Sequence, residues 1–179
     1  MDDRKEQFYK AATRKLLNQL DTMKLSATER HNAKKLTLMF RVMFKNPQVK
    51  MATFGPELNY DISMFTYHAD GFCKASSQSF MHLMQSPDWK LMYINETWTF
   101  GPHHYLLHVP SRQVFDLTAD QYAQYGIDIP YNMGYHVTLN KQERQSAERF
   151  LKAVRSFTQT EKDLDNAKTR TICKAGHDI

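Results

Sequence analysis

The chain has 179 residues, of which 41% are hydrophobic, and a formal net charge of +5. This length and composition predict one globular domain with a buried core and exclude a disordered chain. No apolar run reaches the roughly 20 residues that span a membrane, and the N-terminal residues lack the apolar segment of a secretory signal. With only two cysteines, Cys73 and Cys173, we expect a cytoplasmic protein without a disulfide framework.

The charge is unevenly distributed along the chain. Residues 1–50 hold 12 Lys and Arg against 5 Asp and Glu, whereas residues 51–130 hold 3 against 8. A basic helical region can bind nucleic acid, but a charged helix face is more often simply solvated. We therefore expect the basic region to be a packed structural layer and do not expect nucleic-acid binding.

Two amphipathic helices are expected at the start of the chain. Within residues 4–22, apolar residues recur every three or four positions. The sequence Ser26-Ala27-Thr28-Glu29 has the form of a capping box and predicts that a second helix begins there, which Asn46-Pro47 is predicted to end. Residues 1–47 are thus predicted to form a helical hairpin. A packed layer is the default role, and a lid over a site or a partner-binding surface are the alternatives.

A cysteine lies where a loop is predicted to become a helix. Asp70-Gly71 is a turn signal, and apolar residues after it, such as Phe72 and Phe80, recur at helical spacing. Cys73 would then lie in the first helical turn, where unpaired backbone N–H groups carry partial positive charge. This position stabilises a thiolate and lowers the pKa of the thiol. The alternative is a buried cysteine that acts as a small hydrophobic residue.

The segment after this helix has β-character. Ser86-Pro87-Asp88 is predicted to end the helix, and residues 89–99 are predicted to form one or two strands. Residues 101–122 have the pattern of a β-hairpin, with Pro110-Ser111-Arg112-Gln113 as the turn. His104 lies near the start of the first hairpin strand and Asp116 near the end of the second, so the two are expected to be close in space.

A cysteine that faces a histidine oriented by a carboxylate forms a Cys–His–Asp arrangement. The histidine accepts the thiol proton, the thiolate attacks a carbonyl carbon, and the carboxylate fixes the imidazole tautomer. We therefore predict that Cys73, His104 and Asp116 are catalytic residues.

The order of these residues resembles that of papain-like and transglutaminase-like thiol enzymes. It is most similar to the YunG-type family, through three motifs: Gly71-Phe72-Cys73, His104-Tyr105, and Asp116-Leu117-Thr118-Ala119-Asp120-Gln121-Tyr122. The resemblance covers roughly residues 70–135. It implies a papain-like fold and a candidate triad, and it supplies no substrate.

Other interpretations of the site residues remain open at this point. His103 is the rival of His104, because strand alternation points the two side chains to opposite faces. The His-Tyr dipeptide and the twelve-residue step to Asp116 favour His104. Asp116 could instead cap the following turn. Zinc could bind Cys73 together with the histidines, but the paired ligand spacings of zinc sites are missing from the sequence, so we expect no metal and no cofactor.

An acyl-transfer site also needs hydrogen-bond donors for the oxyanion. The backbone N–H of Cys73, at the start of a helix, is a natural donor. A second donor could come from a polar residue before Cys73 or from the loop before Gly101. The candidates are Asn59, His68 and Trp98.

The remaining chain is predicted to contain one more helix. Residues 123–136 have the composition of a loop, and Thr138 or Asn140 is predicted to cap a helix with an apolar inner face. Beyond it, residues 159–179 are predicted to be a polar tail.

Together these patterns predict a single α+β domain over residues 1–158. It consists of a helical hairpin at 1–47, a papain-like core with a small antiparallel sheet at 48–136, and a C-terminal helix at 137–158. The predicted function is a cysteine hydrolase or acyltransferase that acts on an amide, isopeptide or thioester bond of a protein or peptide. The alternative is a non-catalytic papain-like module that docks a protein or nucleic acid through the basic helices.

Overall fold

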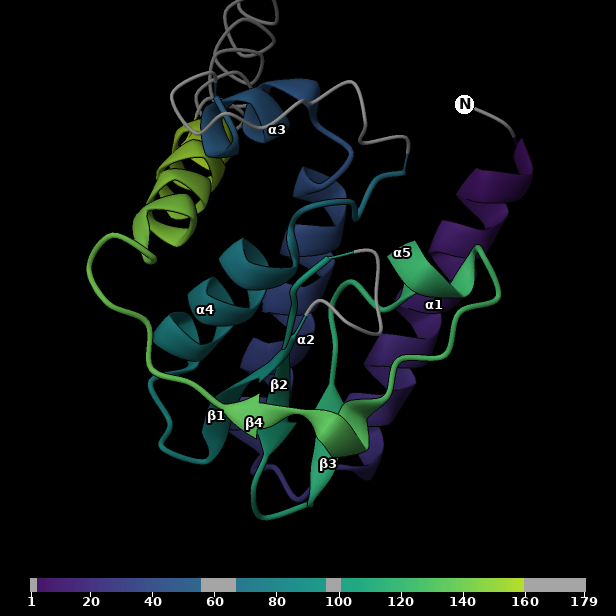
Figure 1. Ribbon diagram of the computed structural model, residues 1–179, viewed down its shortest axis with the longest axis vertical. Coiled ribbons are helices and arrows are strands. Elements are labelled where there is room, and N and C mark those ends of the chain that lie inside the picture. Colours follow the sequence, from purple (N-terminus) through teal and green to yellow (C-terminus); the bar gives the residue numbers. More distant parts are fainter. Residues whose placement is uncertain (1–2, 56–66, 96–100, 160–179) are drawn as a thin grey trace, which may run out of the picture.

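The computed structural model describes residues 3–55, 67–95 and 101–159 (Figure 1). Its helices are α1 (Asp3–Thr22), α2 (Ala27–Met43), α3 (Pro47–Thr53), α4 (Cys73–Met84), α5 (Asp120–Ala123), the 3-10 helix Tyr131–Met133 and a C-terminal helix at 145–159. Its strands are β1 (Trp89–Ile94), β2 (His103–His108), β3 (Gln113–Phe115) and β4 (Tyr135–His136). Helices combined with a small antiparallel sheet confirm the α+β class. Within the described ranges, no helix is both long and apolar enough to cross a membrane.

The sheet has four strands in the order β3-β2-β1-β4, and its described pairings are antiparallel. Helix α4 packs on β1 and β2, and α2 contacts both α4 and α1. In Figure 1, α4 lies beside the sheet on the left and α1 runs along the right. The predicted helical hairpin is therefore present, as α1 and α2, and it packs against the helix that carries Cys73.

The helix starts follow their predicted caps, with one addition. The Ser26 hydroxyl accepts the N–H of Glu29, and the Glu29 carboxylate accepts the N–H of Ser26, so the predicted capping box is confirmed. Asn46-Pro47 was predicted only to end a helix, but it also begins α3. The Asn46 side chain accepts the backbone N–H of Gln48, and proline at the first helical position has a suitable φ angle.

An aromatic cluster in the core fixes the residue that precedes Cys73. Phe72 is fully buried and stacks on Phe44, the C-cap residue of α2, with ring centroids 4.5 Å apart. It also contacts Phe54 and Phe150, at 4.9 Å and 5.5 Å. Burial of one such side chain contributes on the order of 1.5–3 kcal/mol. The start of α4 is thus held by the packing of the whole domain.

The register of the β2–β3 hairpin decides which side chains share a face. Leu106 pairs with Phe115, and His108 pairs with Gln113, so the connecting loop is 109–112, one residue earlier than the predicted turn. Opposed residues share a face, and successive residues alternate between faces. His103 therefore shares its face with Asp116, whereas His104 lies on the opposite face.

The C-terminal part differs from its prediction in one segment. Residues 123–136 were predicted to be a loop, but they include the 3-10 helix and β4, which pairs with β1 through Met92 and His136. Asn140 and Glu143 exchange hydrogen bonds of 2.7 and 3.0 Å, so Asn140 caps the turn at 141–144, and the final helix begins after that turn, at residue 145. The predicted polar tail from residue 160 onward, including Cys173, lies outside the described residues.

Candidate active site

Cys73 is the first residue of α4, as predicted. A short turn leads to it, in which an Asp70 carboxylate oxygen accepts the N–H of Tyr67 at 2.8 Å. Gly71 follows with a φ of 79°, a left-handed conformation that favours glycine. The N-cap residue, Phe72, makes no side-chain cap. The first N–H groups of α4 thus have no capping side chain and can serve as donors beside the thiol.

His103, and not His104, is the histidine that Asp116 orients. Nε2 of His103 lies 2.6 Å from a carboxylate oxygen of Asp116, and both side chains are buried. The predicted pairing of Asp116 with His104 is therefore wrong. The physical reason is the hairpin register, which places His104 on the other face of the sheet. Nδ1 of His103 has no conventional hydrogen-bond partner among the described residues, which leaves it free to interact with the Cys73 sulfur.

Asp116 both caps a turn and holds a histidine. One carboxylate oxygen accepts the backbone N–H and the hydroxyl of Thr118, at 2.9 and 3.1 Å. The other accepts the Tyr131 hydroxyl at 2.8 Å in addition to His103. Burial by itself would raise the pKa of Asp116, but the charge and hydrogen bond of His103, together with the other donors, hold that pKa below its usual value. Asp116 is therefore a carboxylate at neutral pH.

The thiol and the imidazole shift each other's ionisation. Burial by itself raises the pKa of Cys73, but the neighbouring imidazoles of His103 and His104 lower that pKa to about 5. Burial by itself lowers the pKa of His103, but Asp116 and the Cys73 sulfur raise it to about 10. Between these two values the folded protein holds a thiolate beside an imidazolium, the protonation state that makes Cys73 a nucleophile.

His104 lies near the thiol without a carboxylate partner. Its ring packs on Tyr93, with centroids 4.9 Å apart, and its backbone carbonyl lies 3.5 Å from the Ser77 hydroxyl of α4. Nδ1 of His104 is buried and has no hydrogen-bond partner within the described ranges. His104 therefore stabilises the thiolate alongside His103 but is not part of the hydrogen-bonded chain to Asp116.

The structure describes one of the three candidates for the second oxyanion donor. Nε2 of His68 lies 3.3 Å from a carboxylate oxygen of Glu6, and its ring contacts the Tyr9 ring at 4.8 Å, so His68 is engaged with α1. Asn59 and Trp98 lie outside the described residues. The Cys73 sulfur lies 3.9 Å from the Pro102 carbonyl oxygen, which places the thiol at the start of β2.

Tyr131 is a site residue that the sequence reasoning missed. Its hydroxyl donates to Asp116, and its backbone carbonyl accepts the Tyr105 hydroxyl at 2.9 Å. A side-chain carbon at Gly134 would lie only 1.9 Å from the Tyr105 hydroxyl, so this approach requires glycine. The segment was predicted to be a loop because it lacks a hydrophobic period, and no local signal marks Tyr131.

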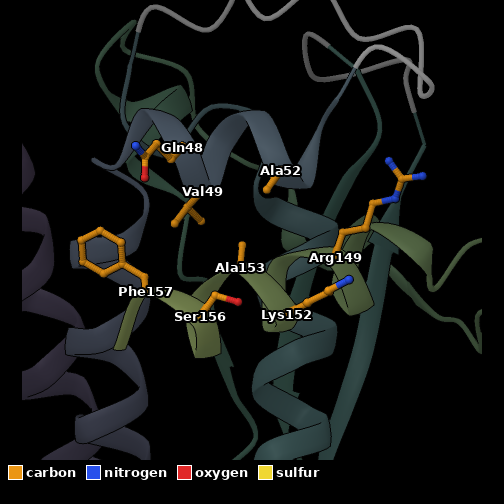
Figure 2. Close-up of a pocket in the computed structure, with 8 residues that line it drawn as sticks. All are labelled: Gln48, Val49, Ala52, Arg149, Lys152, Ala153, Ser156 and Phe157. Atoms are coloured by element: carbon orange, nitrogen blue, oxygen red, sulfur yellow. The ribbon is translucent and has the colours of Figure 1, made fainter. Parts of the chain in front are cut away.

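Three surface hollows of similar volume lie among the described residues, one of them between α1 and α2, and none of the three is lined by Cys73 or His103. The first, of about 570 Å³, lies between α3 and the C-terminal helix. Figure 2 shows Val49 and Ala52 on one side of it and Ala153 on the other. The second, of about 560 Å³, lies between α1 and the segment from β3 to Tyr131, and Asp116 is one of the residues that line it. Among the described side chains, no group of three or more metal-binding residues is arranged to hold an ion.

Comparisons with known proteins found no matching family model, no matching curated protein and no matching solved structure. The functional assignment therefore rests on the geometry and electrostatics of the site.

Proposed function

We propose that this protein is a cysteine enzyme that forms an acyl intermediate on Cys73. His103 acts as the general acid and base, and Asp116 orients and charges it. The observation that carries this proposal is a buried imidazole held by a carboxylate 2.6 Å away, which lowers the pKa of a thiol at a helix start. Strongly shifted ionisation in such a cluster is characteristic of functional sites.

In the proposed reaction, the Cys73 thiolate attacks the carbonyl carbon of an amide, isopeptide or thioester. A carbon–sulfur bond forms, and the carbonyl electron pair moves to oxygen, where N–H groups at the start of α4 stabilise the negative charge. The carbonyl re-forms and expels the leaving group, which takes a proton from His103. Water or an amine then attacks the thioester and gives its proton to His103, which releases the product and regenerates the thiolate. The second acceptor decides between hydrolysis and acyl transfer.

We further propose that the core is papain-like or transglutaminase-like and that the chain is a relative of the YunG-type family. The supporting feature is the order of the parts, with the cysteine on a helix and the histidine and aspartate on two successive strands or just beyond them. In this proposal the histidine of the triad is His103 and not the histidine of the His-Tyr motif, because His103 contacts Asp116. The substrate class that fits is a protein or peptide with a reactive carbonyl side chain or backbone.

A non-catalytic binding module with basic docking helices has less support. Several of the basic residues are already engaged within the hairpin. Lys10 and Lys45 pair with Glu6, and Lys34 pairs with Asp21. Arg41 is buried. The free positive charge on these helices is thus smaller than the sequence count indicates.

The acyl intermediate is directly testable by intact-protein mass spectrometry. After brief incubation with p-nitrophenyl acetate and an acid quench, we expect one acetyl group on the wild-type protein, and peptide mapping should place it on Cys73. Cys173→Ala should retain the acetyl group, and Cys73→Ala should lose it. Acetylation absent from the wild type, or shared equally between the two cysteines, would contradict the proposed function.

A further inference from the structure

Arg41 is a buried residue of α2 that no catalytic step uses. Its side chain is 2% exposed, and its guanidinium lies 3.6 Å from the centre of the Tyr9 ring. A guanidinium has five N–H donors, and here each one has an acceptor. The acceptors are Thr13 Oγ1 at 3.0 Å, the Leu117 carbonyl at 3.0 Å, the Tyr9 carbonyl at 3.1 Å, and the two Asp120 carboxylate oxygens at 2.8 and 2.6 Å.

These acceptors come from two separate parts of the chain. Thr13 and the Tyr9 carbonyl belong to α1, whereas Leu117 lies in the turn that follows β3 and Asp120 is the first residue of α5. Leu117 lies between Asp116 and Thr118, the two residues whose contacts hold the carboxylate against His103. Arg41 therefore holds the backbone of the segment that follows β3 through the Leu117 carbonyl.

Asp120 extends the same network toward the nucleophile. One of its carboxylate oxygens accepts the Tyr67 hydroxyl at 2.7 Å. Tyr67 begins the turn that leads through Asp70 and Gly71 into α4. The Arg41–Asp120 pair thus contacts both segments that carry the reacting groups, the one before Cys73 and the one after Asp116.

We propose that Arg41 and Asp120 are positioning residues that fix the spacing between the Cys73 thiol and the His103 imidazole. This inference rests on the proposed function and assigns the helical hairpin a role in it as the support of the active site. A buried ion pair contributes little net stability, because desolvation of the two charges offsets their attraction. A displacement of about 1 Å in reacting groups can cost on the order of a hundredfold in rate. The ion pair is bidentate, and every N–H donor of the guanidinium has an acceptor, which suits a positioning role. Lysine could not fill this role, because its ammonium group lacks the rigid fork of donors.

The test is a double substitution, Arg41→Met with Asp120→Leu, which removes the pair without leaving one charge buried alone. The matched control is Lys34→Met with Asp21→Leu. It removes an exposed ion pair between α1 and α2, with a 2.7 Å contact, in which neither residue contacts the segment 116–120. For each folded variant, the alkylation rate of Cys73 by iodoacetamide is measured from pH 4.5 to 9, and thermal unfolding is followed in parallel. The pH profile separates positioning from stability, because a purely structural role would change the melting temperature alone.

We expect the double substitution to move the midpoint of the alkylation profile up by at least about one pH unit, while the control keeps the wild-type midpoint. If the double variant does not fold, Tyr67→Phe, which deletes one hydroxyl, decides the question by the same readout. A low wild-type midpoint that the folded test variant keeps would contradict this inference alone. A wild-type midpoint near that of an ordinary thiol would contradict the proposed function and this inference together.

Discussion

At the scale of single residues, the two histidines next to Cys73 differ in what holds them. His103 contacts a carboxylate that accepts hydrogen bonds from two further residues, Thr118 and Tyr131, so its ring is fixed and its positive charge is compensated. Nδ1 of His104 has no such partner among the described residues. Only His103 therefore has both the orientation and the charge compensation that repeated proton transfer requires.

This difference predicts unequal effects of the two alanine substitutions. His103→Ala should slow acylation of Cys73 by about a hundredfold or more, because it removes the general base and the larger share of thiolate stabilisation. His104→Ala should have a clearly smaller effect, since the His103–Asp116 pair remains. Single-turnover acylation rates of the two variants check this, with circular dichroism to confirm folding. A larger loss in His104→Ala than in His103→Ala would contradict the assignment.

The choice between the two histidines could have been made from the sequence. The predicted turn and the observed loop both contain four residues, and an even number of loop residues pairs odd positions with even ones. Asp116 must then share a face with odd-numbered residues of the first strand, which include His103 and exclude His104. The prediction of His104 rests on the His-Tyr motif and the twelve-residue spacing, and register is the stronger physical constraint.

At the scale of elements, local signals predicted the helix starts well and the irregular segments poorly. The capping box at Ser26, the cap at Asn140 and the turn before Cys73 are satisfied by residues within a few positions, so the sequence contains the whole signal. The contacts of Tyr131 and Arg41 join segments 15 and 79 residues apart, and no local pattern records them. The α+β class, the place of Cys73 at a helix start and the place of Asp116 just after a hairpin strand could therefore be predicted, whereas the contacts of Tyr131 and Arg41 could not.

At the scale of the whole molecule, the thiolate–imidazolium pair predicts how stability depends on pH. The pKa of His103 is raised to about 10 in the folded state, so its contribution is complete below about 6.5 and is lost as pH rises through 10. The pKa of Cys73 is lowered to about 5, so its contribution is complete above about 8.5–9 and is lost as pH falls through 5. Between about pH 6.5 and 8.5 both states bind nearly the same number of protons, and this pair adds little slope.

We therefore expect the Cys73 thiol to contribute a fall in the free energy of unfolding between about pH 6.5 and 5. In that interval the histidine of the unfolded chain takes up a proton, whereas His103 of the folded protein already carries its proton. The Cys73 thiolate of the folded protein remains unprotonated until the pH approaches 5. The unfolded state therefore binds more protons than the folded state. Burial lowers the pKa of His68 and of His108, which also makes the free energy of unfolding fall as pH decreases, in wild type and variants alike.

The comparison of wild type with Cys73→Ala isolates the contribution of the site. Urea titrations at a series of pH values should show a steeper acid limb in the wild type, and equal limbs would argue against the ion pair.

The ionisation of Cys73 in the folded wild-type protein is the central claim, and its alkylation rate measures it most directly. The rate of carbamidomethylation by iodoacetamide is followed at Cys73 by peptide mass spectrometry at pH 8 and at pH 6. With a pKa of about 5, the thiol is almost fully ionised at both values, so the rate should change by less than about twofold. An ordinary thiol with a pKa near 8.5 slows by nearly a hundredfold over the same interval. A slowing of that size at Cys73, or a reaction that begins only when the protein is denatured, would contradict the account.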